Sequence, residues 1–139
     1  MTRINVVPVS ELSDQHLIAE YRELPRVIKQ DIDVSDAPKK YCLGKGHMKW
    51  ARKHVKFILK RYKELCDEME FRGFKVNYSW SVLVFMSVYW GSTSEDYYND
   101  YKITRKDLTL NRNRLIEKYC MKSNWYRWTK REKPKYMET

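Results

Sequence analysis

An apolar stripe between Met48 and Met69 constrains the fold more than any other feature of the chain. Its apolar residues recur every three or four positions: Met48, Ala51, Val55, Ile58, Tyr62, Leu65 and Met69. This spacing is typical of the face of an α-helix that packs on a core, and Gly73 supplies a C-terminal stop. We therefore expect one long helix that ends near Gly73, with its stripe in the core rather than at a cofactor site.

Basic residues cover the remaining surface near the start of this expected helix: Lys49, Arg52, Lys53, Lys56 and Lys60. Such a run is either a solvated face or a surface that contacts phosphates, and the pattern leaves both open. His54 lies in the middle of the run, and we expect it to be incidental.

A shorter helix is expected to begin after Ser13, a good N-cap residue. Its apolar face comprises Leu17, Tyr21, Leu24 and Ile28. Pro25 falls inside this pattern, where it removes a backbone hydrogen bond. The helix should therefore either kink beside Glu23 or end there.

A third helix is predicted from Thr104, which forms a capping box with Asp107, to about Met121. Leu108, Leu115 and Tyr119 are spaced to face the core. Arg114 and Lys118 lie four residues apart on another face, so the same helix can pack and hold an anion.

These patterns predict an all-α fold: a compact single domain over residues 1–139, with about three main helices, long loops and an aromatic-basic C-terminal segment. That segment begins after Ser123 and reads NWYRWTKREKPKY. Its composition suits stacking on bases and neutralising phosphates, but a loop folded back on the core fits equally.

The balance of 28 basic against 18 acidic side chains gives a net charge of +10. Such a charge favours a polyanionic partner and salt-sensitive binding. The N-terminus has no apolar targeting segment, and the apolar run from Val82 to Trp90 is too short to span a bilayer. We interpret that aromatic-rich run as core rather than a stacking surface, and we expect an intracellular, cytoplasmic protein that is not secreted and not bound to a membrane.

Cys42, Cys66 and Cys120 are odd in number and lack metal-ligand spacing. We expect buried, inert thiols in a reducing compartment, with no disulfide framework and no metal site. Residues 29 to 42 have the composition of a loop, with Asp31, Asp33 and Asp36, and these acids should point away from any bound phosphate.

The first residues carry a candidate reaction centre. Removal of Met1 would expose the α-amine of Thr2, which has a pKa of about 7.7 to 8 and a substantial neutral fraction near pH 7. A neutral amine can form a Schiff base with electrophilic carbon. Glu23 is the candidate proton shuttle, and Arg22 and Arg26, on the same amphipathic segment as His16, could bind phosphates beside it.

Three blocks of the sequence carry a resemblance to a known family. The most specific is MTRINVVPVSELSDQHLIAEYRELPRV at residues 1–27. The second is LGKGHMKW at 43–50 with KFILKRYKELCDEMEFRGF at 56–74, and the third is NRLIEK at 113–118 with NWYR at 124–127. These blocks resemble the pyrimidine-dimer DNA glycosylases of the phage endonuclease V type, and they cover roughly half the chain in the order of the family.

This resemblance implies a DNA glycosylase with abasic-site lyase activity, in which the amine of Thr2 attacks the sugar and Glu23 supports β-elimination. It implies damaged double-stranded DNA as substrate, kinked with a flipped-out nucleotide, and no cofactor. We expect the enzyme to act as a monomer. The residues assigned to DNA binding are Arg3, His16, Arg22, Arg26, His47, Arg114, Lys118, Trp125 and Tyr126.

Some segments depart from the family pattern. Residues 48 to 53 replace paired aromatics and an acid, residues 77 to 104 match poorly, and Trp128 to Glu132 replace a glycine-containing ending. The resemblance therefore constrains the identity of the lesion less than it constrains the lyase chemistry. Two alternatives stay open: the same lyase acting on another damaged or modified base, and a DNA-binding module without activity.

Overall fold

The computed structural model describes residues 4–28, 33–78, 82 and 99–137. Within these residues the chain forms four α-helices and no strand, so the all-α prediction is confirmed. The helices are α1 (Asp14–Glu23), α2 (His47–Lys53), α3 (Val55–Phe71) and α5 (Arg105–Met121). Three single-turn 3-10 helices accompany them: η1 (Val9–Glu11), η2 (Leu24–Arg26) and η3 (Lys135–Met137).

The prediction of one unbroken helix from Met48 to Gly73 is wrong, because the chain breaks at His54. The His54 backbone has φ −114° and ψ 50°, outside the helical region. Its ring Nδ1 lies 2.7 Å from the carbonyl oxygen of Trp50, the oxygen that the His54 N–H would bind in a continuous helix. The N–H instead donates to Ala51. The side chain thus competes with the helix ladder, and His54 is a structural residue rather than an incidental one.

The helix predicted after Ser13 is confirmed at both ends. The Ser13 hydroxyl accepts a hydrogen bond from the backbone N–H of His16, as an N-cap does. Of the two outcomes expected at Pro25, the helix end is the one observed: α1 stops at Glu23, and η2 turns the chain beyond it. Glu23 is therefore the last residue of its helix.

The capping box at the start of α5 is also confirmed, with the Thr104 hydroxyl and the Asp107 carboxylate each bound to the other residue's backbone N–H. Tyr101 donates a further hydrogen bond to Asp107 over 2.7 Å. Leu115 is buried, and Leu108 and Tyr119 pack against the core as predicted.

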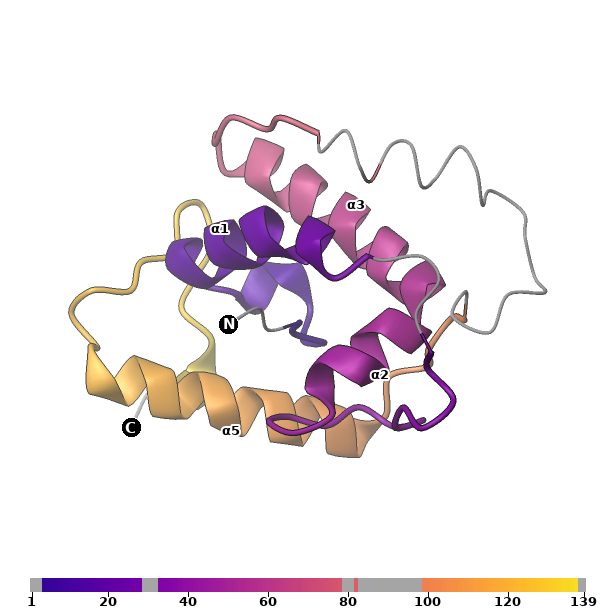
Figure 1. Ribbon diagram of the computed structural model, residues 1–139. Coiled ribbons are helices and arrows are strands. Elements are labelled where there is room, and N and C mark those ends of the chain that lie inside the picture. The colour runs from indigo at the N-terminus through magenta and orange to yellow at the C-terminus, as the bar shows by residue number, and fades with distance from the viewer. Residues whose placement is uncertain (1–3, 29–32, 79–81, 83–98, 138–139) are drawn as a thin grey trace.

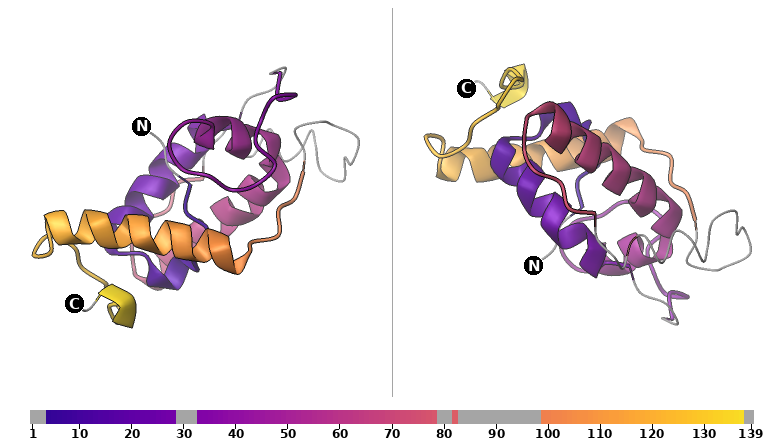
Figure 2. Two further views of the ribbon diagram at one scale, coloured as in Figure 1. Left: turned by 90° about the horizontal axis from the view of Figure 1, so that it is seen from below. Right: turned by 90° about the horizontal axis from the view of Figure 1, so that it is seen from above.

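The helices form two layers around the N-terminal segment, residues 4–7. Helices α1 and α3 lie side by side on one side of the molecule, and α5 crosses on the other (Figures 1 and 2). Ile4, Val6 and Val7 are almost completely buried between them. Trp50, which is fully buried, anchors the far end of the core through ring contacts with Tyr41, His47, His54, Phe57 and Tyr101.

The C-terminal segment after α5 folds back on the core through buried charges. The side chain of Thr129 donates to Asp14 over 2.6 Å, and Arg131 pairs with Glu68 at 2.9 Å. Both carboxylates are also bound by Arg72, whose side chain is fully buried. The fold-back alternative is therefore realised for this part of the segment, while Trp125 keeps 55% of its surface exposed.

All three cysteines are free thiols, but the prediction that they are buried holds only for Cys66. Cys42 is half-buried and Cys120 is exposed. Burial raises the pKa of the Cys66 thiol to about 11, which keeps it protonated. Among the described residues, none of the helices has the length and apolarity required to cross a bilayer. The aromatic run from Val82 to Trp90 falls, apart from Val82, outside the described residues.

Candidate active site

The extended N-terminal segment has no strand partner among the described residues, and buried side chains bind its backbone instead. The N–H of Ile4 donates to Nε2 of His47 over 2.9 Å, and the hydroxyl of Tyr41 donates to the Ile4 carbonyl over 2.8 Å. Because Nε2 accepts, the ring proton of His47 must be on Nδ1, which lies 2.7 Å from the carbonyl oxygen of Cys42. The structure thus places His47 at Ile4, where its ring anchors the backbone of the N-terminal segment.

The next residues of the segment are fixed in the same way. The side-chain oxygen of Asn111, on α5, accepts hydrogen bonds from the N–H groups of Val6 and Val7 over 2.7 and 3.1 Å. Arg61, on α3, donates to the carbonyl of Val7 over 2.6 Å. These contacts satisfy buried backbone groups that would otherwise cost free energy, so the segment is held in one place.

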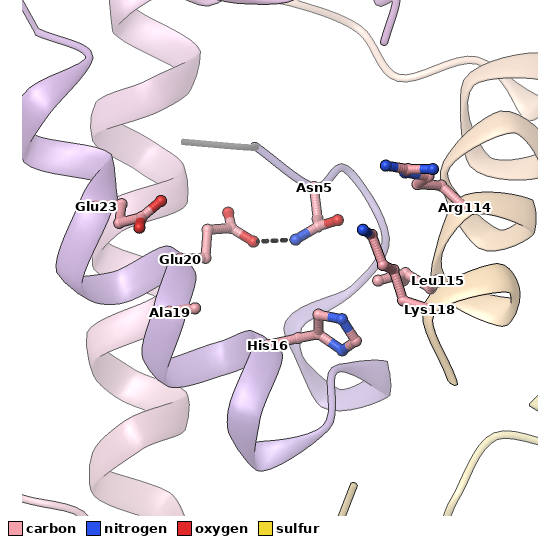
Figure 3. Close-up of a pocket in the computed structure, with 8 residues that line it drawn as sticks. All are labelled: Asn5, His16, Ala19, Glu20, Glu23, Arg114, Leu115 and Lys118. Atoms are coloured by element: carbon pink, nitrogen blue, oxygen red, sulfur yellow. Dashed lines mark hydrogen bonds between the residues drawn. The ribbon is translucent and has the colours of Figure 1, made fainter. Parts of the chain in front are cut away.

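A cleft of about 400 Å³ opens between α1 and α5, with the N-terminal segment as its floor. Its lining residues are Asn5, His16, Ala19, Glu20, Glu23, Arg114, Leu115 and Lys118. Figure 3 shows the carboxylates on the α1 side, the cations on the α5 side and Asn5 between them. The cleft therefore has an acidic wall that faces a basic wall.

The two carboxylates of the cleft differ in what they bind. Glu20 is buried, receives a hydrogen bond from Asn5 over 2.8 Å and forms an ion pair with Arg61 at 2.8 Å. Glu23 is one turn further along α1 and half-buried. Within the described part of the chain, the Glu23 carboxylate has no hydrogen bond or ion pair. Glu20 is thus committed to the fold, and Glu23 is the carboxylate available for chemistry.

On the opposite wall, Arg114 and Lys118 project from successive turns of α5 (Figure 3). Arg114 pairs with Glu117 at 3.1 Å through one terminal nitrogen, while its Nε is buried and lacks a hydrogen-bond partner in the described structure. Lys118 forms no ion pair with a described residue. This wall can therefore receive an anion such as a phosphate.

His16 joins the cleft to the aromatic C-terminal segment. Its ring stacks on Tyr126 with centroids 4.8 Å apart, and Tyr126 in turn contacts Trp125 edge-on at 5.1 Å. Burial, together with the nearby charge of Lys118, lowers the pKa of His16 to about 4. His16 is therefore a neutral ring at pH 7, and Trp125 extends an exposed aromatic surface beyond the cleft.

The family model of the pyrimidine dimer DNA glycosylases matches residues 1–82 of the chain. That span is more than half of the chain and carries the N-terminal segment and α1 to α3, including Glu23. The chain belongs to the pyrimidine dimer DNA glycosylase family. The resemblance inferred from the sequence is thereby confirmed, and DNA is the substrate of such an enzyme.

Helix α5 and the aromatic segment lie beyond the part of the chain matched to the glycosylase family. The structure nevertheless brings Arg114 and Lys118 to the same cleft as Glu23, and Tyr126 onto His16. Four of the residues predicted for the site therefore meet at one place: His16, Glu23, Arg114 and Lys118.

Other predicted site residues of the glycosylase do not line this cleft. Arg22 and Arg26 are exposed, and because α1 ends at Glu23, Arg22 lies on α1 and Arg26 on η2. Thr2 and Arg3 lie outside the described residues. DNA contact by these arginines stays a prediction.

The sequence reasoning missed Asn5 and Glu20, which also line the cleft. Glu20 could have been found, because it lies four residues after His16 and three before Glu23, on one face of α1. Asn5 carries no comparable signal, since its role depends on a distant asparagine, Asn111. Within the described residues, no group of three histidines, cysteines or carboxylates is arranged to hold a metal ion.

Proposed function

We propose that this glycosylase excises cyclobutane pyrimidine dimers and then cleaves the strand as an abasic-site lyase, through a Schiff base formed by the amine of Thr2. The observation that supports this function best is the cleft itself. The carboxylate of Glu23, which has no hydrogen bond or ion pair with any residue that the structure describes, faces the cations of α5 across Asn5. Asn5 is three residues after Thr2.

Covalent connection keeps the proposed nucleophile near this carboxylate. Three residues span at most roughly 11 Å when fully extended, so the amine of Thr2 is within that distance of the backbone of Asn5. With Met1 removed, the amine titrates near pH 8 and is partly neutral at pH 7. It is then able to attack C1′ of the damaged nucleotide, and the C1′–N bond to the base breaks as the new C–N bond forms.

Glu23 serves two steps in this scheme. Its negative charge stabilises the cationic sugar that develops as the base leaves. The C1′–O4′ bond then breaks as the attached nitrogen loses its proton and forms the C1′=N double bond of the imine, and the carboxylate relays the C2′ proton. Loss of that proton drives β-elimination, in which the 3′ phosphate departs and the strand is cut. The committed ion pair of Glu20 leaves Glu23 as the carboxylate for both steps.

The basic wall holds the DNA in this proposal. Arg114 and Lys118 bind phosphates beside the lesion, and the exposed Arg22 and Arg26 add contacts along the backbone. The neutral ring of His16 with Tyr126 and Trp125 offers a stacking surface for bases in a kinked duplex. A dimer lowers the cost of unstacking, which favours flipping at the lesion.

Borohydride trapping tests the proposal on two duplexes, one with a cyclobutane dimer and one with a preformed abasic site. Reduction converts an imine into a stable bond, and mass spectrometry locates the modified residue. We expect an adduct at the α-amine of Thr2 on both duplexes. An adduct on abasic DNA alone would support the lyase activity and would show that the substrate is a lesion other than the cyclobutane dimer. No adduct on either duplex, from protein whose mass shows that Met1 is absent, would overturn the proposal.

A further inference from the structure

A continuous series of buried polar side chains runs behind the cleft and joins three helices to the N-terminal segment. Arg61 of α3 pairs with Glu20 of α1 at 2.8 Å, and Glu20 accepts a hydrogen bond from the side chain of Asn5 over 2.8 Å. The oxygen of Asn5 then accepts from the side chain of Asn111, on α5, over 2.8 Å. We call these four residues the amide relay.

The amide relay is buried, and both asparagines use the nitrogen as well as the oxygen of the side-chain amide. Asn111 is 0% exposed, Glu20 3% and Asn5 4%. Asn5 uses its side-chain nitrogen toward α1 and its side-chain oxygen toward α5, and Asn111 binds two backbone N–H groups with its own oxygen. Leaving one buried group unpaired typically costs about 1 to 3 kcal/mol. Each bond therefore has a single favourable geometry, which apolar packing would not impose.

Each member of the relay lies next to a group that lines the cleft. Glu20 is one helical turn before Glu23, and Asn111 is one turn before Arg114 and two before Lys118. Because helices are stiff over one or two turns, the position of Asn5 relative to both helices fixes the separation of the acidic and basic walls. Helix α5 is outside the part matched to the family, so this coupling comes from the structure alone.

We propose that Asn5 is a positioning residue, whose side-chain amide couples α1 to α5 and so sets Glu23 against Arg114, Lys118 and the segment that leads to Thr2. This inference rests on the proposed Schiff-base function. Asn5 acts through the groups that it positions, and it need not touch the reacting sugar itself. A displacement of about 1 Å in such a site can cost on the order of 100-fold in rate.

The experiment exchanges the two ends of one hydrogen bond. Asn5→Asp removes the donor and sets a second carboxylate against Glu20, and Glu20→Gln removes the charge while keeping the shape. In the double variant, which carries both substitutions, the amide introduced on α1 would donate to the carboxylate introduced on the N-terminal segment. This exchange would restore the bond with its direction reversed and the same net charge as the wild type. The oxygen of the introduced amide keeps the hydrogen bond from Nε of Arg61, whereas the longer bond from the other Arg61 nitrogen, 3.2 Å from the Glu20 oxygen that accepts from Asn5, is lost. Asn113→Asp, at an exposed position on α5 outside the cleft, is the control for the added charge.

The readout is the single-turnover rate of borohydride trapping on an abasic duplex, together with the Kd for that duplex. We expect each single variant to trap at least tenfold more slowly than the wild type, with Kd changed no more than in Asn113→Asp. The double variant should recover most of the rate. A residue that only stabilises the fold is not expected to slow trapping while binding stays unchanged. Nor is the exchange of the two side chains expected to restore the trapping rate of such a residue.

Circular dichroism and thermal unfolding show whether each variant is folded. Should Asn5→Asp fail to fold, Asn5→Leu provides a probe that adds no charge and is expected to trap equally slowly. A folded Asn5 variant that traps at the wild-type rate, or a double variant no faster than its slower parent, would overturn this inference alone. A wild-type protein that forms no adduct at Thr2 would instead overturn the proposed function, and this inference with it.

Discussion

The imidazole of His16 lies parallel to the ring of Tyr126, with centroids 4.8 Å apart and planes inclined by 8°. The stack joins the first turn of α1 to the C-terminal segment, although the two residues are 110 positions apart in the sequence (126 − 16). It also removes His16 from water beside the charge of Lys118, and both effects disfavour the protonated ring. The aromatic surface of the C-terminal segment is therefore coupled to the charge state of one histidine in the cleft.

Stability should fall in acid through His16. The pKa of His16 is about 4 in the folded protein against 6.5 ordinarily, so between these values the unfolded chain binds the extra proton. The contribution of the neutral ring is complete above pH 6.5 and is lost as the pH falls toward 4, by roughly 1 to 3 kcal/mol. Urea unfolding at pH 7 and pH 4.5 measures it. His16→Gln should flatten this part of the pH dependence, and an NMR titration that gives an ordinary pKa for His16 would contradict the prediction.

Glu23→Gln should bind dimer-containing duplex as tightly as the wild type and cleave it on the order of 100-fold to 10,000-fold more slowly, the usual range for loss of a general acid or base. Glu70→Gln makes the same chemical change on the exposed face of α3 and should leave cleavage unchanged. Strand cleavage on a sequencing gel and binding by fluorescence anisotropy measure the two effects. Full activity of Glu23→Gln would remove this carboxylate from the mechanism.

Lys118→Met should weaken binding to dimer-containing and undamaged duplexes alike and reduce the salt dependence of log Kd by about one unit of slope, because one phosphate contact is lost. The matched control is Lys63→Met, which removes the same charge from an exposed position on α3. Anisotropy titrations over a range of salt concentrations give both slopes. Equal slopes for the two variants would show that Lys118 does not contact a phosphate.

Much of this fold follows from local signals in the sequence. The N-cap of Ser13, the stop at Pro25 and the capping box of Thr104 are short-range effects, and each is found where the sequence predicts it. The break at His54 escaped prediction because the apolar stripe continues across it in register. The break depends on a hydrogen bond between a ring nitrogen of His54 and the carbonyl oxygen of Trp50. The spacing of apolar residues carries no information about such a bond.

The candidate site was predictable only in part, for a related reason. Glu23 and the pair Arg114 and Lys118 could be named from spacing and resemblance, but their meeting in one cleft depends on how α5 packs. That packing is directed by Asn5 and Asn111, 106 residues apart, whose side chains bind each other in the core. Single polar residues with partners so distant leave no periodic signal in the chain.

Gly46→Ala should lower stability more than Gly44→Ala. Both glycines have positive φ values, 74° for Gly44 and 91° for Gly46, so each alanine carries a strain of about 1 to 2 kcal/mol. A Cβ at Gly46 would also lie 3.0 Å from Cγ of Pro38, whereas one at Gly44 meets nothing within 4 Å. Gly46 is the N-cap of α2, next to His47, so the variant should also slow imine formation by loosening the anchor of Ile4. Thermal unfolding measures the stability of the two variants. Equal losses of stability would show that the Pro38 ring moves to accept the added Cβ.

Arg72→Met should lower the free energy of unfolding by about 3 to 5 kcal/mol, since breaking a buried ion pair leaves uncompensated charge. Arg72 is fully buried and binds Asp14 and Glu68, which hold Thr129 and Arg131 of the C-terminal segment. Burial works to raise the pKa of Glu68, but hydrogen bonds and charges from Arg131 and Arg72 outweigh it and lower the pKa overall. The ion-pair contribution is therefore present at neutral pH and is lost as the carboxylate is protonated in acid.

The loss of stability in Arg72→Met should consequently shrink as the pH falls below the ordinary range for a glutamate. Denaturant unfolding at pH 7 and pH 4 measures both values. Arg105→Met, at an exposed position at the start of α5, removes the same kind of charge and should change stability by less than about 0.5 kcal/mol. A similar small effect for Arg72→Met would mean that apolar packing, and not the ion pairs, keeps the C-terminal segment against α1 and α3.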